Sequence, residues 1–205
     1  MSYDEILDAF SIGGINASNP VFDEQKLIAF NKDHIKTAPI DQLVTLIAPL
    51  LVESKLTESG WVDDSANCEY LKKVIDVMRE RLWVVKDISQ LAGFFFSEPT
   101  EYDSKGVSKR FKPETAEQLV NLADSFESLE KFDHTSLEVA LDSVADKQGV
   151  KRADIIHAVR LAVSGMTQGP GLFDLLALVG KERTVARLRK AIEFIRNMKP
   201  QPQTQ

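Results

Sequence analysis

Residues 151–179 read KRADIIHAVRLAVSGMTQGPGLFDLLALV, two apolar segments separated by a glycine-rich break. In the first segment Ile155, Val159 and Val163 recur every four residues, which is the spacing of one face of an α-helix. The glycines that follow interrupt this pattern because glycine is a poor helix former, and the apolar run 172–179 then resumes it. The segment predicts two helices joined by a tight loop.

The same helical period recurs along nearly the whole chain, and no run of alternating β-branched residues between turn signals predicts a sheet. Start signals support the helices: Ser2 with Glu5 and Thr135 with Glu138 have the spacing of capping boxes, and Asp63-Asp64 is an N-cap pair. The expected fold class is all-α, with helices over about 2–10, 23–31, 40–52, 66–81, 88–96, 113–129, 135–149, 151–163, 172–179 and 181–196.

One polar segment, residues 97–113, contains two prolines and one glycine and lacks an apolar period. We place a subdomain break there. The chain is thus predicted to form two consecutive helical-bundle subdomains, residues 1–104 and 105–198. The Pro/Gln-rich residues 199–205 are predicted to be a disordered tail.

Composition excludes several classes of function. The chain has 205 residues, of which 43% are hydrophobic and 27% charged, so it is long enough to bury one or two cores. Its single cysteine excludes a disulfide framework, and the three histidines have no metal-ligand spacing, so we expect no metal site. No apolar stretch is long enough to cross a bilayer, which predicts a soluble, cytoplasmic protein without a membrane partner. No nucleophile elbow, phosphate loop or dinucleotide fingerprint is present, so we expect no catalytic residue and no cofactor in this chain.

Charge is distributed unevenly. Residues 1–104 carry 9 Lys+Arg against 18 Asp+Glu, whereas residues 105–205 carry 16 against 13. A basic end of this kind can bind a polyanion, although basic residues on amphipathic helices also simply solvate an outer face. On the first interpretation the phosphate-binding side chains are Lys147, Lys151, Arg152, Lys181, Arg183 and Arg187.

The loop after the helix 151–163 has the chemistry of a single-stranded RNA site. Arg160 lies near a glycine-terminated helix end, and Pro170 at a helix start leaves neighbouring amides free for a phosphate or a base edge. Leu172 and Phe173 offer apolar surface to an unstacked base. An ordinary proline- and glycine-containing connection between helices explains the same residues equally well.

Motifs outside this loop carry a family resemblance. Residues 16–35 read NASNPVFDEQKLIAFNKDHI, residues 78–81 MRER, residues 94–102 FFFSEPTEY, residues 109–114 KRFKPE and residues 180–183 GKER. In this order, and together with the 151–179 segment, they resemble the part of bacterial-type glutamyl-tRNA synthetases that follows the catalytic core. The resemblance covers about residues 3–197.

The resemblance implies an all-α anticodon-binding region whose partner is the anticodon loop of glutamate tRNA. The resemblance places Arg81 where an arginine reads the last anticodon base. It implies that other anticodon contacts are made by Arg160, Gly169 and Leu172. Pro170 and Phe173 belong to the same loop and are included in the predicted anticodon site. One departure is Asp142, which stands where some members have arginine and would repel a phosphate.

The resemblance also implies that the chemistry lies elsewhere. The His-Ile-Gly-His and Lys-Met-Ser-Lys-Ser elements of these ligases are not in the sequence, so this chain alone is not expected to be an enzyme. The parent ligase would use ATP and Mg²⁺ in a separate catalytic domain or chain. The alternative is a protein-interaction scaffold without RNA binding, which the net charge of −6 and the acidic first half favour. No DNA partner is expected.

Overall fold

The computed structural model describes residues 3–11 and 21–198. In these ranges every regular element is helical, which confirms the all-α prediction: α1 (Tyr3–Ala9), α2 (Glu24–Thr37), α3 (Ile40–Glu53), η2 (Trp61–Asp63), α4 (Ser65–Met78), η3 (Arg79–Arg81), α5 (Asp87–Leu91), η4 (Gly93–Phe95), α6 (Ser104–Arg110), α7 (Pro113–Glu127), α8 (His134–Gln148), α9 (Arg152–Ser164), α10 (Leu172–Val179) and α11 (Lys181–Asn197). The predicted capping box at Ser2 and the predicted tail 199–205 lie outside the described residues.

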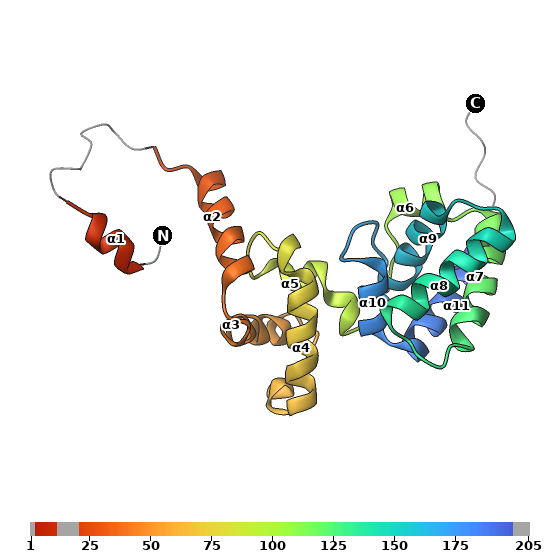
Figure 1. The fold of residues 1–205 in the computed structure, drawn as a ribbon, viewed down its shortest axis with the longest axis horizontal. Coiled ribbons are helices and arrows are strands. Elements are labelled where there is room, and N and C mark those ends of the chain that lie inside the picture. The colour runs from red at the N-terminus through yellow and green to blue at the C-terminus, as the bar shows by residue number, and fades with distance from the viewer. Residues whose placement is uncertain (1–2, 12–20, 199–205) are drawn as a thin grey trace.

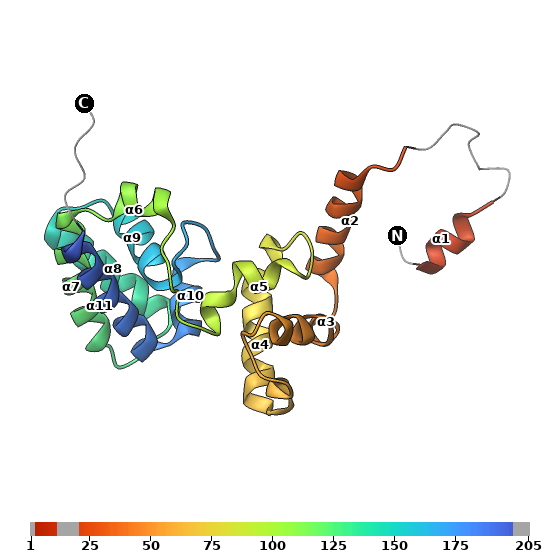
Figure 2. The same ribbon diagram turned by 180° about the vertical axis from the view of Figure 1, so that it is seen from behind.

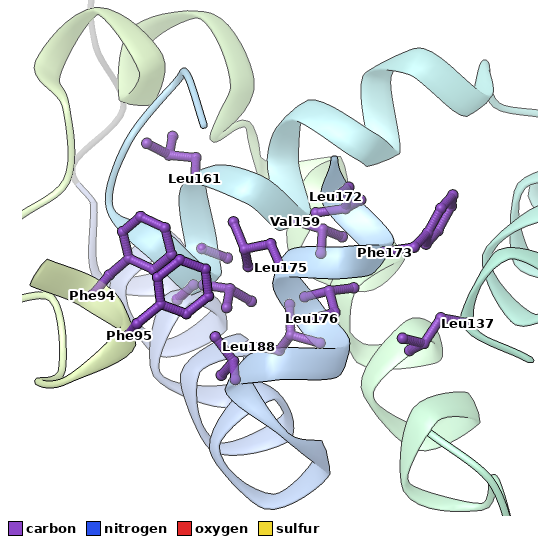
Figure 3. Close-up of a cluster of buried hydrophobic side chains, with 14 of the residues drawn as sticks. Phe94, Phe95, Leu137, Val159, Leu161, Leu172, Phe173, Leu175, Leu176 and Leu188 are labelled. Carbon is purple, nitrogen blue, oxygen red and sulfur yellow. The ribbon is translucent and has the colours of Figure 1, made fainter. Parts of the chain in front are cut away.

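Two groups of helices follow one another along the long axis of the molecule (Figure 1). The first group holds α2–α5, and the second holds α6–α11; the view from behind shows the same division (Figure 2). The division of the chain at 104/105 stays a prediction, because Phe94 and Phe95, which precede it, lie in one buried cluster with Leu161 and Leu175 of the second group (Figure 3). The two groups therefore share one continuous apolar core.

Local signals explain where the helices begin. Asp64 caps α4 by accepting hydrogen bonds from the backbone N–H groups of Ala66 and Asn67, which confirms the predicted N-cap. The predicted capping box at Thr135 is wrong. The side chain of Asp133 caps α8 instead, because it stands three residues before Ser136 and accepts that backbone N–H at 2.9 Å.

Most of the predicted core positions are confirmed. Leu122 in α7, Leu141 in α8 and Val159 in α9 are fully buried, as the four-residue spacing requires. In the helix expected over 40–52, the apolar spacing predicts a wide core face of Leu43, Leu46, Ile47, Leu50 and Leu51. Leu46 is instead 48% exposed, since the buried stripe of α3 is the narrower one formed by Leu43, Ile47 and Leu51.

The polar segment 97–113 is more structured than predicted, because it contains α6. This helix packs against α9, and a Cβ added at Gly106 would lie 2.6 Å from Cγ2 of Thr167. Glycine is therefore required for the close approach. Arg110 at the end of α6 pairs with Asp154 at 2.9 Å and fixes the same helix to the start of α9.

Among the described residues no single helix is long and apolar enough to cross a membrane, although α2 and α3, bent by 118° at their junction, pass a length and composition test as a pair.

Candidate nucleic-acid interface

A cleft of about 470 Å³ opens between the two groups of helices. From the first group it is lined by side chains around η3, and from the second by the loop that joins α9 to α10, which faces α5 in Figure 1. We name these residues the inter-group cleft: Lys32, Arg81, Trp83, Thr167, Gln168 and Gly169.

Two arginines from different groups lie at the inter-group cleft or just behind it: Arg81 lines the cleft, and Arg160 lies beneath Gly169, which also lines it. Arg81 is exposed at the end of η3, and the half-buried Arg160 lies beneath the α9–α10 loop, where its Nη1 donates to the carbonyl of Pro170 at 2.6 Å. Burial lowers the pKa of Arg160, and the charge of Arg81 lowers it further. Neither forms an ion pair with a described residue, which leaves both charges available to an anion.

The loop that covers Arg160 has a defined shape. Gly165 ends α9 with a φ of +75°, and its carbonyl accepts a hydrogen bond from the backbone N–H of Asp103 at 2.8 Å. A Cβ at position 165 would lie 2.6 Å from the carbonyl oxygen of Glu101. The loop is thus attached directly to the segment that connects the two groups.

Two residues predicted to contact a base are placed elsewhere by the structure. Leu172 and Phe173 are buried, and the Phe173 ring lies between α8 and α9, 5.2 Å from the ring of His134 and 5.7 Å from the guanidinium carbon of Arg152. They cannot offer a free surface to a base, so their predicted role is corrected to packing. Pro170 is also buried and contributes its carbonyl to Arg160.

The predicted phosphate-binding residues divide into distinct environments. Lys147 and Lys151 are exposed, and their ammonium groups make no hydrogen bond or ion pair with a described residue. Arg152 is engaged by Glu138 and by Asp142, the latter at 2.7 Å from its Nε. The expected repulsion by Asp142 is therefore balanced within the protein. Nζ of Lys181 donates to the carbonyl of Leu129 at 2.7 Å.

Arg183 and Arg187 of α11 hold the two groups together, and we name them the arginine joint. Arg187 is only 2% exposed and donates to the carbonyls of Val163 and Ser97, each at 3.0 Å. Burial lowers its pKa. Its predicted contact with phosphate is wrong in this structure, because its side chain is enclosed by the protein.

Arg183 is exposed, but its N–H groups are already used. It donates to the carbonyls of Val179 at 2.7 Å and Phe95 at 2.9 Å, and to the hydroxyl of Tyr70 at 3.2 Å. The carbonyl of Leu178 is a fourth acceptor, at 3.4 Å, so a phosphate at this position would have to compete with four partners.

Trp83 is a residue that sequence reasoning missed. It lines the inter-group cleft two residues after Arg81, is 50% exposed, and has Nζ of Lys32 at 4.2 Å from its ring centroid. The signal that could have found it is a tryptophan in a short polar connection beside a predicted base-reading arginine. No group of three or more potential metal ligands occurs in the described part of the chain.

The architecture and the cleft define an all-helical module that presents arginines between two packed groups of helices. The family model described as an anticodon binding domain matches residues 42–192. The chain belongs to this family.

Curated relatives extend the match. A glutamate–tRNA ligase 1 of Caldanaerobacter subterraneus is 35% identical over 91% of this chain, and a glutamate–tRNA ligase of Chlorobaculum parvum is 34% identical over 95% of it. The chain spans only 38% and 39% of the length of these two relatives. A protein-interaction scaffold, the alternative considered above, finds no support among them.

Solved structures agree with the sequence relatives. A crystal structure of a glutamate tRNA ligase from Elizabethkingia meningosepticum, in complex with its amino acid, superposes with a TM-score of 0.84 at 28% identity, covering 95% of this chain and 37% of that one. A glutamate–tRNA synthetase from Elizabethkingia anophelis superposes with a TM-score of 0.78 at 26% identity, covering 94% of this chain and 36% of that one.

Proposed function

We propose that this chain binds the anticodon loop of a glutamate tRNA at the inter-group cleft, as the anticodon-recognising part of a glutamate–tRNA ligase. The names of the relatives support glutamate tRNA as the partner. The observation that carries the proposal is that Arg81 lines the cleft and Arg160 lies directly beneath Gly169, which lines it from the other group of helices. Neither arginine has an ion-pair partner among the described residues.

The geometry supports reading of unpaired bases rather than of a duplex. The cleft is walled by backbone and polar side chains of the α9–α10 loop, among them Thr167 and Gln168, which are exposed. Single-stranded loops are read by such groups together with guanidinium planes, because their unstacked bases offer free edges. The bond from Arg160 to the Pro170 carbonyl fixes the direction of its remaining donors before the RNA arrives.

Non-specific attraction would come from the exposed lysines at the other end of α9. Lys147 and Lys151 flank the turn between α8 and α9 and have no internal partner in the described structure. Each phosphate contact releases counterions, so binding through these side chains weakens as salt is raised.

The chemistry of aminoacylation is proposed to need more than this chain. Activation of glutamate by ATP and Mg²⁺ would take place in a catalytic domain or chain of the ligase, and the chain alone is expected to give no ATP exchange with glutamate. Absence of a catalytic residue, of a cofactor and of a metal in this chain stays a prediction, as does its cytoplasmic location.

Filter binding with glutamate tRNA over a salt series tests the proposal. We expect a complex that weakens linearly on a logarithmic salt scale, and that binds a tRNA with an exchanged anticodon more weakly. A chain that retains neither tRNA at low salt, or that retains both equally, contradicts anticodon recognition at the cleft.

A further inference from the structure

The indole of Trp83 is exposed, although hydrogen bonds with two other residues hold the backbone of Trp83 in place. Its side chain is 50% exposed, whereas the chain's other tryptophan, Trp61, is partly buried in edge-to-face contacts with Tyr70 and Phe96. A large apolar ring left half in water costs free energy relative to burial. The exposure of Trp83 is therefore not explained by packing.

The backbone around Trp83 is fixed from two sides. Oδ2 of Asp87 accepts the backbone N–H groups of Trp83 and Val84, at 2.9 and 3.0 Å, which closes the short connection between η3 and α5. Nδ2 of Asn31 in α2 donates to the carbonyl of Trp83 at 2.8 Å. An aromatic platform on a fixed backbone loses little conformational entropy when a ligand covers it.

The charges near the ring favour an anionic chain with aromatic bases. Nζ of Lys32 lies 4.2 Å from the centroid of the indole and makes no ion pair with a described residue, and Arg81 lines the same cleft. Of the nearby carboxylates, Glu80 pairs with Lys36 at 3.1 Å, whereas Asp87 and Asp103 accept backbone N–H groups and keep their negative charge. Because Nζ of Lys32 lies over one part of the indole, a base would stack on the exposed part of the ring, and its phosphate would meet an ammonium group that has no ion-pair partner among the described residues.

We propose that Trp83 is a stacking platform on which one unpaired base of the bound RNA rests at the inter-group cleft, with Lys32 contacting the adjoining phosphate. The inference rests on the function proposed above and adds to it a binding residue outside the arginines and the α9–α10 loop. The cleft, at about 470 Å³, is within the size range of pockets that hold small organic ligands. Stacking accepts any base, so Trp83 contributes affinity and leaves selectivity to the groups that contact base edges.

The test uses the full chain and a hairpin RNA with the sequence of a glutamate tRNA anticodon arm. Trp83→Leu keeps apolar bulk but removes the aromatic face, and we expect it to weaken binding of the hairpin roughly 5- to 150-fold. Trp83→Phe keeps an aromatic face and is expected to retain most of the affinity. Circular dichroism and the urea midpoint of each variant check that the fold is intact, which we expect because the ring is half exposed.

Hairpins with an abasic nucleotide at each loop position in turn separate stacking from a structural role. At one position, loss of the base is expected to weaken binding by the unaltered chain but not by Trp83→Leu. A Trp61→Phe chain, in which Trp83 is the single tryptophan, is expected to show fluorescence quenching that disappears for the same abasic hairpin.

The outcomes separate this inference from the function on which it rests. Failure of the unaltered chain to bind the hairpin overturns both. Binding by the unaltered chain with equal binding by Trp83→Leu overturns the stacking platform alone. Weaker binding by Trp83→Leu without coupling to any abasic position also overturns it, because the ring then acts without a base.

Discussion

The arginines of the inter-group cleft and those of the arginine joint are the same residue type with opposite surroundings. Arg81 and Arg160 have free donors beside a cleft, whereas Arg183 and Arg187 direct theirs at backbone carbonyls of the protein itself. Val163 and Val179 are in the last turns of α9 and α10, whose carbonyls have no partner within the helix. The joint arginines supply those partners, so a basic residue after a helix end serves the fold as readily as it serves a ligand.

The largest effect is expected where the joint is removed. Arg187→Met keeps much of the side-chain volume but leaves the buried carbonyl of Val163 and the partly buried carbonyl of Ser97 without this donor. An unsatisfied buried group costs roughly 1–3 kcal/mol, and the carbonyl of Val163 is the fully buried one, so the free energy of unfolding should fall by about 1–3 kcal/mol. Urea denaturation followed by circular dichroism measures it.

A matched control is available on the same helix. Arg189 is exposed and pairs with Glu127 on the surface, so Arg189→Met is expected to change stability by less than about 1 kcal/mol. Equal effects of the two substitutions would show that the joint does not depend on buried donors.

Removal of a cleft arginine should affect binding more than stability, although Arg160→Ala also leaves the carbonyl of Pro170 without its donor. Arg160→Ala is expected to weaken cognate tRNA binding by about 1–3 kcal/mol and to reduce the preference over an anticodon-exchanged tRNA, because an edge contact to a base is lost. Filter binding with both tRNAs measures the difference. An equal loss for the two tRNAs would mean that Arg160 contacts the backbone and not a base.

A smaller effect is expected at the exposed lysines. Lys147→Ala should weaken binding of all tRNAs alike and reduce the magnitude of the salt slope by about one unit, because one phosphate contact is lost. Lys181→Ala provides the comparison, since its Nζ already donates to the carbonyl of Leu129. We expect Lys181→Ala to alter the salt slope less than Lys147→Ala does. A larger change for Lys181→Ala would place the phosphate contacts nearer α11.

The smallest effect concerns pH. Burial, followed by the charges of Arg110 and Arg160, lowers the pKa of His157 below its ordinary value of about 6.5. The unfolded chain then binds this proton more readily than the folded one, so stability decreases as pH falls through about 6.5 and levels off below the folded pKa. The change in the free energy of unfolding should be small because His157 is exposed. His157→Asn should remove this pH dependence. If the urea midpoint of the variant follows pH as that of the unaltered chain does, the dependence belongs to another group.

Sequence reasoning was sufficient for the fold because helical period depends on local spacing. It identified the buried faces of α4, α7 and α8, and it failed at Leu46, where the neighbouring helices cover a narrower stripe than the apolar residues offer. The N-cap at Asp133 was missed because three potential capping residues stand close together and only geometry selects among them.

The candidate site was harder to predict, for a physical reason. Arginine is counted as charge in a sequence, but its role depends on which acceptors its five N–H groups meet in space. The acceptors of Arg187 are Val163 and Ser97, 24 and 90 residues away, and no local pattern indicates them. Phe173 was misplaced in the same way, because the surface that covers it belongs to α8 and α9.

The arginine joint also determines what a salt titration of this protein will measure. A backbone carbonyl has no ionisable proton, and guanidinium keeps its charge across the working pH range. Neither the donor nor the acceptor of these hydrogen bonds therefore changes its protonation state with pH. Dissolved ions weaken attraction between surface charges but hardly reach the guanidinium of Arg187, which is enclosed by protein; Arg183 is exposed, but its acceptors carry no net charge to be screened. The angle between the two groups of helices should stay constant as the salt concentration rises. The loss of RNA affinity in a salt titration then reports the number of phosphate contacts and not a change in the shape of the protein.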